Sequence, residues 1–328
     1  MSEPGADAPD APGDLTAAVA AIAGARSVAL ACHVSPDGDA LGSMLALLHV
    51  LRAAGRDVVA SFPTPFRVAP HYRDLPGLDL LVAPTEFPET PDVMVTFDCG
   101  SASRLGDLEP AARRARELVV IDHHVTNERY GTVNLVVPAA AASGVVVQTV
   151  IDALGLPLER DAAVCLYAAL VCDTGRFQYE STTPEVFDLA RRLTEFDVPV
   201  PALSRALFEE HRFAYLKLLG EALGRAELDV DRRFVWTAVT RDMLERHDVS
   251  VDEVEGLIDV LRRAVEAEVT CVCKVDDDGA VRVSLRSLGT VDVAAIAIAN
   301  GGGGHRFAAG FTSTDDVAAT VARIAAAL

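Results

Sequence analysis

The first two-thirds of the chain alternate short apolar runs with helix-like stretches, and this alternation limits the folds available to it. Apolar strands separated by helices favour an α/β fold, with a mainly parallel sheet and helices on both faces. In such sheets, sites form where the carboxyl ends of strands lead into helices. The predicted strands are 27–34, 57–62, 78–83, 92–98, 117–122 and 132–137, and the predicted helices are 39–54, 108–116, 143–154, 159–171 and 184–196.

The pattern changes near Pro199 and Pro201, which disfavour a continuous helix. A long helical pattern then covers 204–223, and the rest of the chain is typical of a smaller α+β domain. Its predicted strands are 233–240, 269–275 and 280–287, with a helix at 251–267. The predicted organisation is a disordered leader at 1–14, a first domain at 15–198, a helical connector at 199–225 and a second domain at 226–328.

Charge and composition exclude several classes of protein. The 328 residues carry a formal charge of −19, and such a surface repels long nucleic acids, which Lys and Arg side chains normally bind. Any phosphate ligand should therefore be small and held in a local pocket with its own positive charge. No apolar run approaches the length of a membrane span, so no membrane role is expected.

The cysteines and the N-terminus predict a cytoplasmic protein. The six cysteines lie in apolar runs without a C-x-x-C pair, which is typical of reduced thiols in a core. The acidic N-terminal stretch, rich in Pro and Gly, has neither the basic start nor the apolar segment of a secretory signal.

Ionisable residues gather where the predicted elements end. Each alone is typical of a helix cap or a turn. Together they place six carboxylates and imidazoles beside apolar elements, which is costly to desolvate unless a cation is bound. Ser143 also lies near a helix end, where the sequence does not distinguish it from a cap. The six are His33, Asp37 and Asp39 in HVSPDGDALGS, Asp98 in VTFDCGS, His123 in ELVVIDHH and Asp173 in ALVCDTGRF.

The types of side chain indicate which metal fits. Without sets of thiolates, a structural zinc site is not expected. Imidazoles among carboxylates favour Mn²⁺, with Fe²⁺, Co²⁺ and Zn²⁺ left open. Six ligands are too many for one catalytic ion, and they suit two ions about 3.5–4 Å apart, bridged by one carboxylate and a hydroxide.

These motifs resemble the DHH phosphoesterase family. The resemblance rests on HVSPDGDALGS (33–43), the isolated Asp98 and the DHH at 122–124, while GGGGHRFAAG (301–310) resembles the glycine-rich motif of the DHH-associated domain. The motifs occur in the family's order over nearly the whole chain. The most similar branch is the bacterial nanoRNase/pAp phosphatase group, which cleaves very short oligonucleotides and 3′-phosphoadenosine 5′-phosphate (pAp). Some actinobacterial relatives act on cyclic di-AMP or on its linear product pApA.

The resemblance implies two Mn²⁺ ions per subunit and a homodimer. Asp122 would lie outside the ligand set and orient an imidazole, and His124 would face the substrate phosphate and protonate the leaving oxygen. The nucleophile would be a hydroxide that bridges the ions. One ion would be held by His33, Asp37 and Asp98, and the other by Asp39, Asp98, His123 and Asp173, with Asp98 bridging.

The C-terminal motif predicts contacts to phosphate, although a flexible glycine turn is the alternative. It lacks the G-K-[ST] ending of a P-loop, but glycines let backbone N–H groups approach a phosphate. In the family, an arginine in a nearby strand and the loop histidine contact the phosphate. The second domain would then engage one end of a short substrate while the first domain cuts. The implied contacts are Arg286, His305, Gly302, Gly303 and Gly304, with Arg306 a weaker candidate.

The sequence argues against three other functions. A family-II inorganic pyrophosphatase shares the DHH metal set, but its basic Ser-Arg-Lys-Lys-Gln-type signature is missing here. A RecJ-like exonuclease is longer, has extra domains and works on long single strands. A nucleotide sensor without catalysis should lack metal ligands, and all six positions are filled.

Overall fold

The computed structural model describes residues 12–276 and 279–328, which fall into two compact units. The first unit runs to Val68 and continues over Tyr72–Leu207, and the second comprises Ala69–His71 and Phe208–Leu328. None of the helices in the described part of the chain combines the length and the apolar composition that a bilayer-crossing segment needs.

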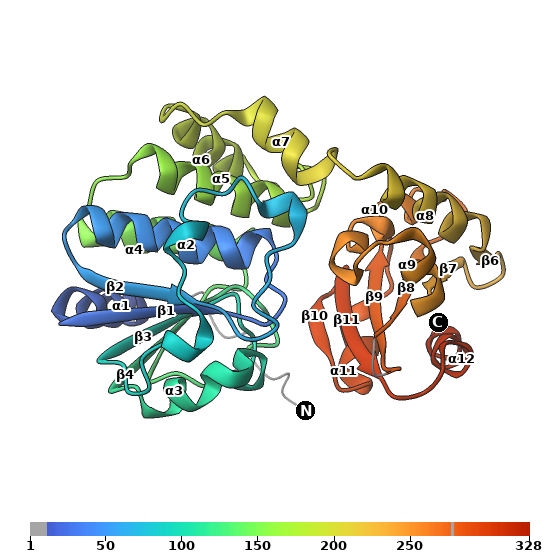
Figure 1. The fold of residues 1–328 in the computed structure, drawn as a ribbon, viewed down its shortest axis with the longest axis horizontal. Coiled ribbons are helices and arrows are strands. Elements are labelled where there is room, and N and C mark those ends of the chain that lie inside the picture. Colours follow the sequence, from blue (N-terminus) through green and yellow to red (C-terminus); the bar gives the residue numbers. More distant parts are fainter. Residues whose placement is uncertain (1–11, 277–278) are drawn as a thin grey trace, which may run out of the picture. The chain divides into compact units, whose positions relative to one another are not determined.

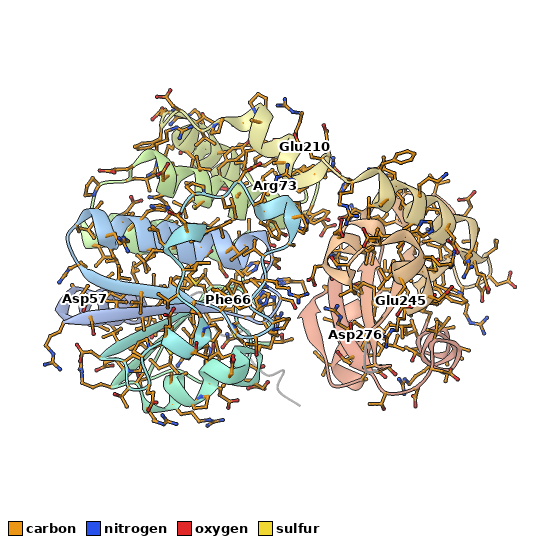
Figure 2. All side chains as sticks on the ribbon, in the orientation of Figure 1. Asp57, Phe66, Arg73, Glu210, Glu245 and Asp276 are labelled. Carbon is orange, nitrogen blue, oxygen red and sulfur yellow. The ribbon has the colours of Figure 1, made fainter. Side chains whose placement is uncertain are left out.

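The first unit is built on a five-stranded parallel sheet, as the alternating pattern predicts. Helices α2 and α4 cover one face, with α5 packed against both of them, and η4 and α3 cover the other face, with side chains filling the space between the layers (Figures 1 and 2). The strand order is β2-β1-β3-β4-β5, with β1 (Ser27–Cys32), β2 (Asp57–Ser61), β3 (Val93–Phe97), β4 (Glu117–Asp122) and β5 (Val133–Val136). The helices are α1 (Pro12–Gly24), α2 (Gly38–Ala53), η4 (Ala102–Leu108), α3 (Glu109–Arg114), α4 (Ser143–Leu154), α5 (Arg160–Asp173), α6 (Pro184–Thr194) and α7 (Val200–Phe208).

The register of this sheet brings separated motifs to one edge. Cys32 pairs with Phe97, and Phe97 pairs with Ile121, so the three central strands end at the same level. The next residue after each of these is an imidazole or a carboxylate. His33, Asp98 and Asp122 therefore lie side by side at the carboxyl edge of the sheet, where α/β folds place their sites.

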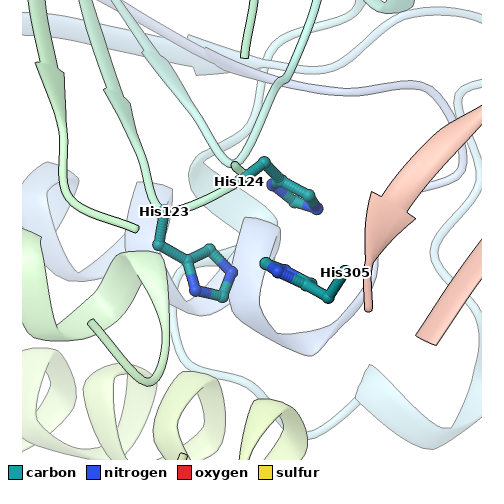
Figure 3. A group of neighbouring side chains, drawn as sticks. All are labelled: His123, His124 and His305. Carbon is teal, nitrogen blue, oxygen red and sulfur yellow. The ribbon is translucent and has the colours of Figure 1, made fainter. Parts of the chain in front are cut away.

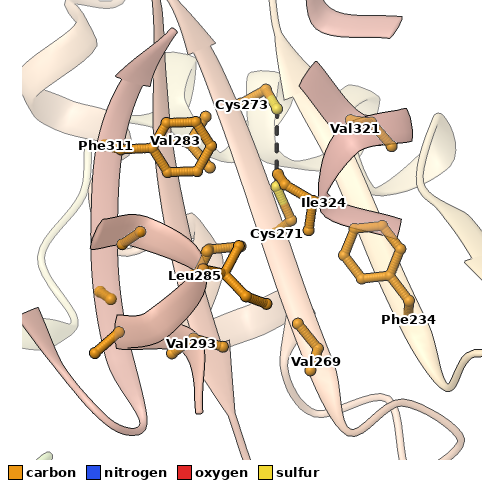
Figure 4. Packing of buried hydrophobic residues seen from close by; sticks show 14 of the residues in the cluster. Phe234, Val269, Cys271, Cys273, Val283, Leu285, Val293, Phe311, Val321 and Ile324 are labelled. Atoms are coloured by element: carbon orange, nitrogen blue, oxygen red, sulfur yellow. Dashed lines mark hydrogen bonds between the residues drawn. The ribbon is translucent and has the colours of Figure 1, made fainter. Parts of the chain in front are cut away.

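The second unit is the predicted α+β domain, with a six-stranded mixed sheet. A core of apolar side chains, including Phe234, Leu285 and Ile324, packs between the sheet and helices α11 and α12 (Figure 4). Helices α8, α9 and α10 contribute to a second core on the opposite face. The strand order is β10 (Gly303–His305), β11 (Ala308–Ser313), β9 (Val281–Ser287), β8 (Val269–Val275), β7 (Phe234–Val239) and β6 (Glu227–Asp229); the helices are α8 (Phe213–Gly224), α9 (Arg241–His247), α10 (Leu257–Leu261), α11 (Val293–Ala299) and α12 (Val317–Ala326).

The prediction of a strand at 78–83 is wrong. This run contains the short 3₁₀ helix η2 (Leu78–Leu80), and the chain enters it through Gly77 in a left-handed conformation, with φ of 92°. Only Val82 reaches the sheet, where its N–H donates to the carbonyl of Ala60. A short apolar run does not by itself distinguish a strand from a helical turn.

Two predicted helices are interrupted. The stretch 204–223 is divided between α7 and α8, and the break at 209–212 is a run of exposed polar side chains. The stretch 251–267 contains η5 (Val251–Val254) and the short α10, separated near Gly256. At the other end of the chain, α1 begins at Pro12, inside the stretch expected to be a leader, and residues 1–11 lie outside the described residues.

The contact between α2 and α5 depends on Gly42. A Cβ atom at this position would lie 2.4 Å from the carbonyl oxygen of Cys165 and 3.0 Å from Cβ of Ala169. We expect Gly42→Ala to lower the free energy of unfolding by about 1–3 kcal/mol, because the two helices must separate. Gly24→Ala is the control, since its Cβ would meet no atom within 4 Å. Chemical denaturation followed by circular dichroism measures both, and equal effects would contradict the role of Gly42.

Candidate metal centre

The loop between β1 and α2 positions two carboxylates in different ways. Asp37 caps α2, since its Oδ1 accepts hydrogen bonds from the backbone N–H groups of Asp39 and Ala40 at 3.1 and 3.0 Å. Its Oδ2 is left to face the Nε2 atom of His33 at 4.0 Å. Asp39 lies one residue into the helix and is fully buried. The start of α2 therefore directs the carboxylates of Asp37 and Asp39 to different sides of the turn.

The first group of possible ligands comprises His33, Asp37 and Asp98, whose ligand atoms all lie within 4.8 Å of one another. The Nε2 atom of His33 is 3.6 Å from Oδ2 of Asp98. Its Nδ1 lies 2.8 Å from the carbonyl oxygen of Val34, which can only accept a hydrogen bond. Nη2 of Arg104, which can only donate, lies 3.0 Å from the same Nδ1, so these two contacts call for different tautomers. The tautomer with its proton on Nδ1 directs the lone pair of Nε2 toward the carboxylates, as a metal ligand requires.

The second group comprises Asp39, His123 and Asp173. The Nε2 atom of His123 lies 3.7 Å from Oδ2 of Asp39 and 3.0 Å from Oδ2 of Asp173. It also lies 3.5 Å from Oδ1 of Asp98, so Asp98 reaches both groups. Nδ1 of His123 donates to the carbonyl of Ala140 at 3.0 Å, which leaves the lone pair of Nε2 for a metal. All six ligands predicted from the sequence thus come together in the first unit.

The N-terminus of α4 holds the buried carboxylate of Asp39. Oδ2 accepts a hydrogen bond from the N–H of Ser143 at 2.6 Å, and Oδ1 accepts from the N–H of Gly144 at 2.9 Å and from the hydroxyl of Ser43 at 3.1 Å. The Ser143 hydroxyl also donates to Oδ1 of Asp98 at 3.0 Å. Ser143 therefore contacts both groups of ligands, although no sequence pattern distinguishes it from an ordinary helix cap.

The electrostatics of the cluster favour a cation. Burial and the neighbouring carboxylates of Asp98 and Asp173 raise the pKa of Asp39 well above its usual range. Burial also raises the pKa of Asp98, but the imidazoles of His124 and His123 outweigh it and hold this pKa well below its usual range. Burial lowers the pKa of His123, yet its bonds to Asp173 and Asp98 leave it well above its usual range. In the absence of a bound cation, protonated imidazoles balance the negative charge of the carboxylates. A divalent ion can take the place of these protons.

Asp122 orients a neighbouring histidine. Its Oδ1 accepts hydrogen bonds from the backbone N–H groups of His123 and His124, and it lies 2.8 Å from Nδ1 of His124. Its Oδ2 accepts from the side-chain amide of Asn127 at 2.5 Å. Both oxygens of Asp122 are thus engaged, and the carboxylate can hold the imidazole of His124 in place. Asn127 was missed by the sequence analysis, because an Asn in a loop carries no distinctive signal.

The two histidines that follow β4 differ in exposure. Their ring centroids lie 5.1 Å apart with an angle of 69° between the rings, so the imidazoles face different directions (Figure 3). The His123 side chain is 4% exposed, whereas that of His124 is 15% exposed. His123 is therefore enclosed by carboxylates, and His124 is the imidazole that solvent or a substrate can reach.

In the second unit, Arg286 and His305 lie on neighbouring parts of one sheet. Both are register partners of Ala308, which lies between them on β11. Residues that pair across a sheet point to the same face, so the two side chains are about 10 Å apart on one face. The Nε atom of Arg286 is buried and, among the described residues, has no hydrogen-bond partner. This leaves a donor for a ligand.

The glycine run belongs to the edge of this sheet. Gly303 and Gly304 lie in β10, which pairs with β11. A Cβ atom at Gly302 would lie 2.1 Å from the carbonyl of Gly310, and Gly304 has a φ of 135°. Close backbone packing therefore accounts for Gly302 and Gly304. Arg306 is engaged elsewhere, since its guanidinium donates to the carbonyl of Thr290 at 3.2 Å.

A parallel α/β domain with paired His and Asp groups at its carboxyl edge, followed by an α+β domain, defines a class of phosphoesterases. The profile described as the DHH family, N-terminal domain, matches residues 27–170, and that of the DHHA1 domain matches residues 234–328. The chain belongs to the DHH family and is a phosphoesterase, a hydrolase.

Curated relatives align with most of the chain. A bifunctional oligoribonuclease and PAP phosphatase NrnA from Thermus thermophilus is 32% identical over 285 residues, which cover 86% of this chain and 83% of that protein. A probable protein of the same description from Streptococcus mutans is 26% identical, covering 86% and 87% of the two chains. The crystal structure of an exopolyphosphatase-related protein from Bacteroides fragilis has the same fold, with a TM-score of 0.85, 22% identity and coverage of 96% and 95%.

Two substitutions at Asp37 separate helix capping from metal binding. Asp37→Asn keeps a cap acceptor but removes the charge that faces His33, so we expect unchanged stability and at least about tenfold weaker Mn²⁺ binding. Asp37→Ala removes both and should lower the free energy of unfolding by a further 0.5–2 kcal/mol, or about 1 kcal/mol in a typical helix. Titration calorimetry and chemical denaturation measure the two effects. Wild-type Mn²⁺ affinity in Asp37→Asn would show that Asp37 is only a cap.

Proposed function

We propose that this protein hydrolyses short oligonucleotides, pApA and pAp with the help of two Mn²⁺ ions, and that it accepts cyclic di-AMP as a further substrate. One observation carries the proposal: the two groups of ligands share Asp98, which lies 3.6 Å from Nε2 of His33 and 3.5 Å from Nε2 of His123. A shared carboxylate between two sets of ligands is the arrangement that two-metal phosphoesterases use.

The donor set fits divalent ions of this kind. Both imidazoles present Nε2 to the carboxylates, because the carbonyls of Val34 and Ala140 bind their Nδ1 atoms. His33, Asp37 and Asp98 would hold one ion, and the remaining ligands, with Asp98, would hold the other. When bound, the pair supplies an activated water and neutralises charge on the phosphate. The mixture of nitrogen and oxygen donors favours Mn²⁺ over Mg²⁺.

His124 is the proposed general acid. Its Nδ1 is bonded to Oδ1 of Asp122 at 2.8 Å, which directs Nε2 away from this carboxylate. Burial lowers the pKa of His124, but the carboxylates of Asp98 and Asp122 outweigh it, so the net shift is upward. A histidine that keeps its proton near neutral pH, and that a substrate can reach, is suited to protonate the leaving oxygen.

The second domain is proposed to bind a phosphate at the other end of a short substrate. Support comes from the buried Nε atom of Arg286, which lacks a partner among the described residues, and from His305 on the same face of the sheet. The relatives' names give oligoribonuclease and PAP phosphatase activities, both on phosphate esters of nucleotides. The net charge of −19 supports a preference for short substrates, because a long RNA would be repelled.

The setting of the enzyme is part of the proposal. None of the six cysteines, all of which lie in the described part of the chain, forms a disulfide, and five of them are buried, which fits a reducing compartment such as the cytoplasm. The homodimer expected from the family stays a prediction.

A panel of substrates tests this function. With Mn²⁺, we expect hydrolysis of pAp, pApA and a three-nucleotide RNA, and turnover of a twenty-nucleotide RNA slower by roughly 100-fold because of charge repulsion. Cyclic di-AMP and pyrophosphate complete the panel. His123→Ala should lose activity on every substrate, whereas His247→Ala, which changes a histidine paired with Glu221 in the second unit, should retain it. Equal turnover of the short and the long RNA would contradict the proposed length preference, and equal activity of His123→Ala and wild type would contradict the metal centre.

The role of His124 predicts a dependence on the leaving group. We expect His124→Ala to lower kcat on pApA by about 10²–10⁴-fold, the usual contribution of a general acid. The p-nitrophenyl ester of thymidine 5′-phosphate should be affected far less, because p-nitrophenolate leaves without a proton. Asn127→Ala removes a hydrogen bond to Asp122, the residue that orients His124. It should therefore show the same pattern, with kcat on pApA lowered by roughly 10–100-fold. Steady-state kinetics on both substrates checks this, and equal losses would mean that His124 acts on binding or metal affinity.

A further inference from the structure

Arg104 of the first unit lies against one of the ligand groups, beside His33. Arg104 belongs to η4, which follows Asp98 and β3 in the chain. Its carbonyl accepts a hydrogen bond from the N–H of Val34 at 2.9 Å, and the next residue, Leu105, is fully buried. Its side chain is exposed, and its Nη2 atom lies 3.0 Å from Nδ1 of His33. The backbone of Arg104 is thus fixed to the loop that carries His33, while its guanidinium remains in contact with solvent.

The contact with His33 occupies no more than one N–H group of the guanidinium. Nη2 of Arg104 lies 3.0 Å from Nδ1 of His33, and this nitrogen accepts from Arg104 only in the tautomer that does not donate to the carbonyl of Val34, 2.8 Å away. Within residues 12–276 and 279–328, no carboxylate forms an ion pair with Arg104. The guanidinium therefore keeps at least four of its five N–H donors beside a cluster of carboxylates that it does not neutralise.

The chemistry of the substrate calls for such a group. A phosphate ester must approach five carboxylates on a protein whose net charge is −19. A guanidinium presents paired N–H donors that match two phosphate oxygens, and it stays charged at every physiological pH. Because Arg104 is exposed, it can turn toward a ligand without breaking an ion pair. The neighbouring carboxylates repel a phosphate that binds to Arg104 alone. Arg104 therefore favours a phosphate that the metal centre also holds.

We propose that Arg104 binds a phosphate oxygen of the substrate on the His33 side of the metal centre. This proposal rests on the proposed function, because it assigns a substrate contact to the same site. It gives the first domain a cationic group of its own, in addition to Arg286 and His305 in the second domain. Arg104 is then a specificity residue for phosphate, distinct from the ligands of the ions.

Inorganic phosphate is the probe that tests the assignment. In titration calorimetry on the full-length, Mn²⁺-loaded protein, Arg104→Ala should weaken phosphate binding by roughly 10–100-fold, the usual effect of losing a charged hydrogen bond. The phosphate affinity of Arg104→Lys should lie between that of wild type and that of Arg104→Ala, because an ammonium cannot bind two oxygens in parallel. Arg113→Ala is the matched control, since Arg113 is an exposed arginine of α3 that pairs with Glu109, and it should bind phosphate like wild type. The affinity for Mn²⁺ should change less than about threefold in all three.

Each outcome decides the matter. Phosphate affinity in Arg104→Ala equal to that of wild type overturns the proposal. A parallel loss of Mn²⁺ affinity also overturns it, because Arg104 would then only position His33. Loss of phosphate binding with unchanged Mn²⁺ binding supports it, as does a raised KM for pAp in the same variant. Calorimetry needs no turnover, so the role of Arg104 is decided even if wild type hydrolyses none of the substrates, a result that would overturn the proposed function alone.

Discussion

The burial of Asp98 is the constraint on which the rest of the site depends. Its carboxylate is 2% exposed and lies at the end of the central strand β3, with a φ of 53°. A left-handed backbone is uncommon outside glycine, although Asp adopts it more readily than most residues. This turn lets the side chain face both imidazoles rather than continue the line of the strand. A buried charge in such a place is costly unless oppositely charged groups surround it.

The surrounding structure meets that cost in two ways. Hydrogen bonds come from α4, whose first residues bind Asp39 and Asp98 together through Ser143. The positive end of a helix macrodipole adds to these bonds. Positive charge comes from His123, because its hydrogen bonds to Asp173 and Asp98 outweigh the effect of burial and raise its pKa. The hydrogen bonds fix the positions of the carboxylate oxygens. The net charge of the cluster depends on whether protons or cations balance these carboxylates.

Sequence patterns predicted the main fold and which six candidate ligands lie close together, because each of these residues lies at the end of a strongly apolar element. They were insufficient for Ser143, Asn127 and Arg104. The bond from Ser143 to Asp39 joins residues 104 positions apart, and only the packing of α4 against α2 creates it. The run 78–83 has the composition of a strand, but the turn at Gly77 directs it into η2. Local composition thus predicts elements, whereas contacts between loops follow from the packing of the whole domain.

The distribution of charge connects this site to the length of its substrates. A protein with a net charge of −19 gains nothing from each additional phosphate of a long strand, because every nucleotide beyond the site meets a repulsive surface. Attraction is expected where positive charge is held by geometry: at the paired ligand groups when they bind ions, at Arg104 beside His33, and at Arg286 and His305 in the second unit. Under the proposed function, a substrate with one or two phosphates would place its charge at these groups. The acidic surface would then favour such a substrate over a long RNA.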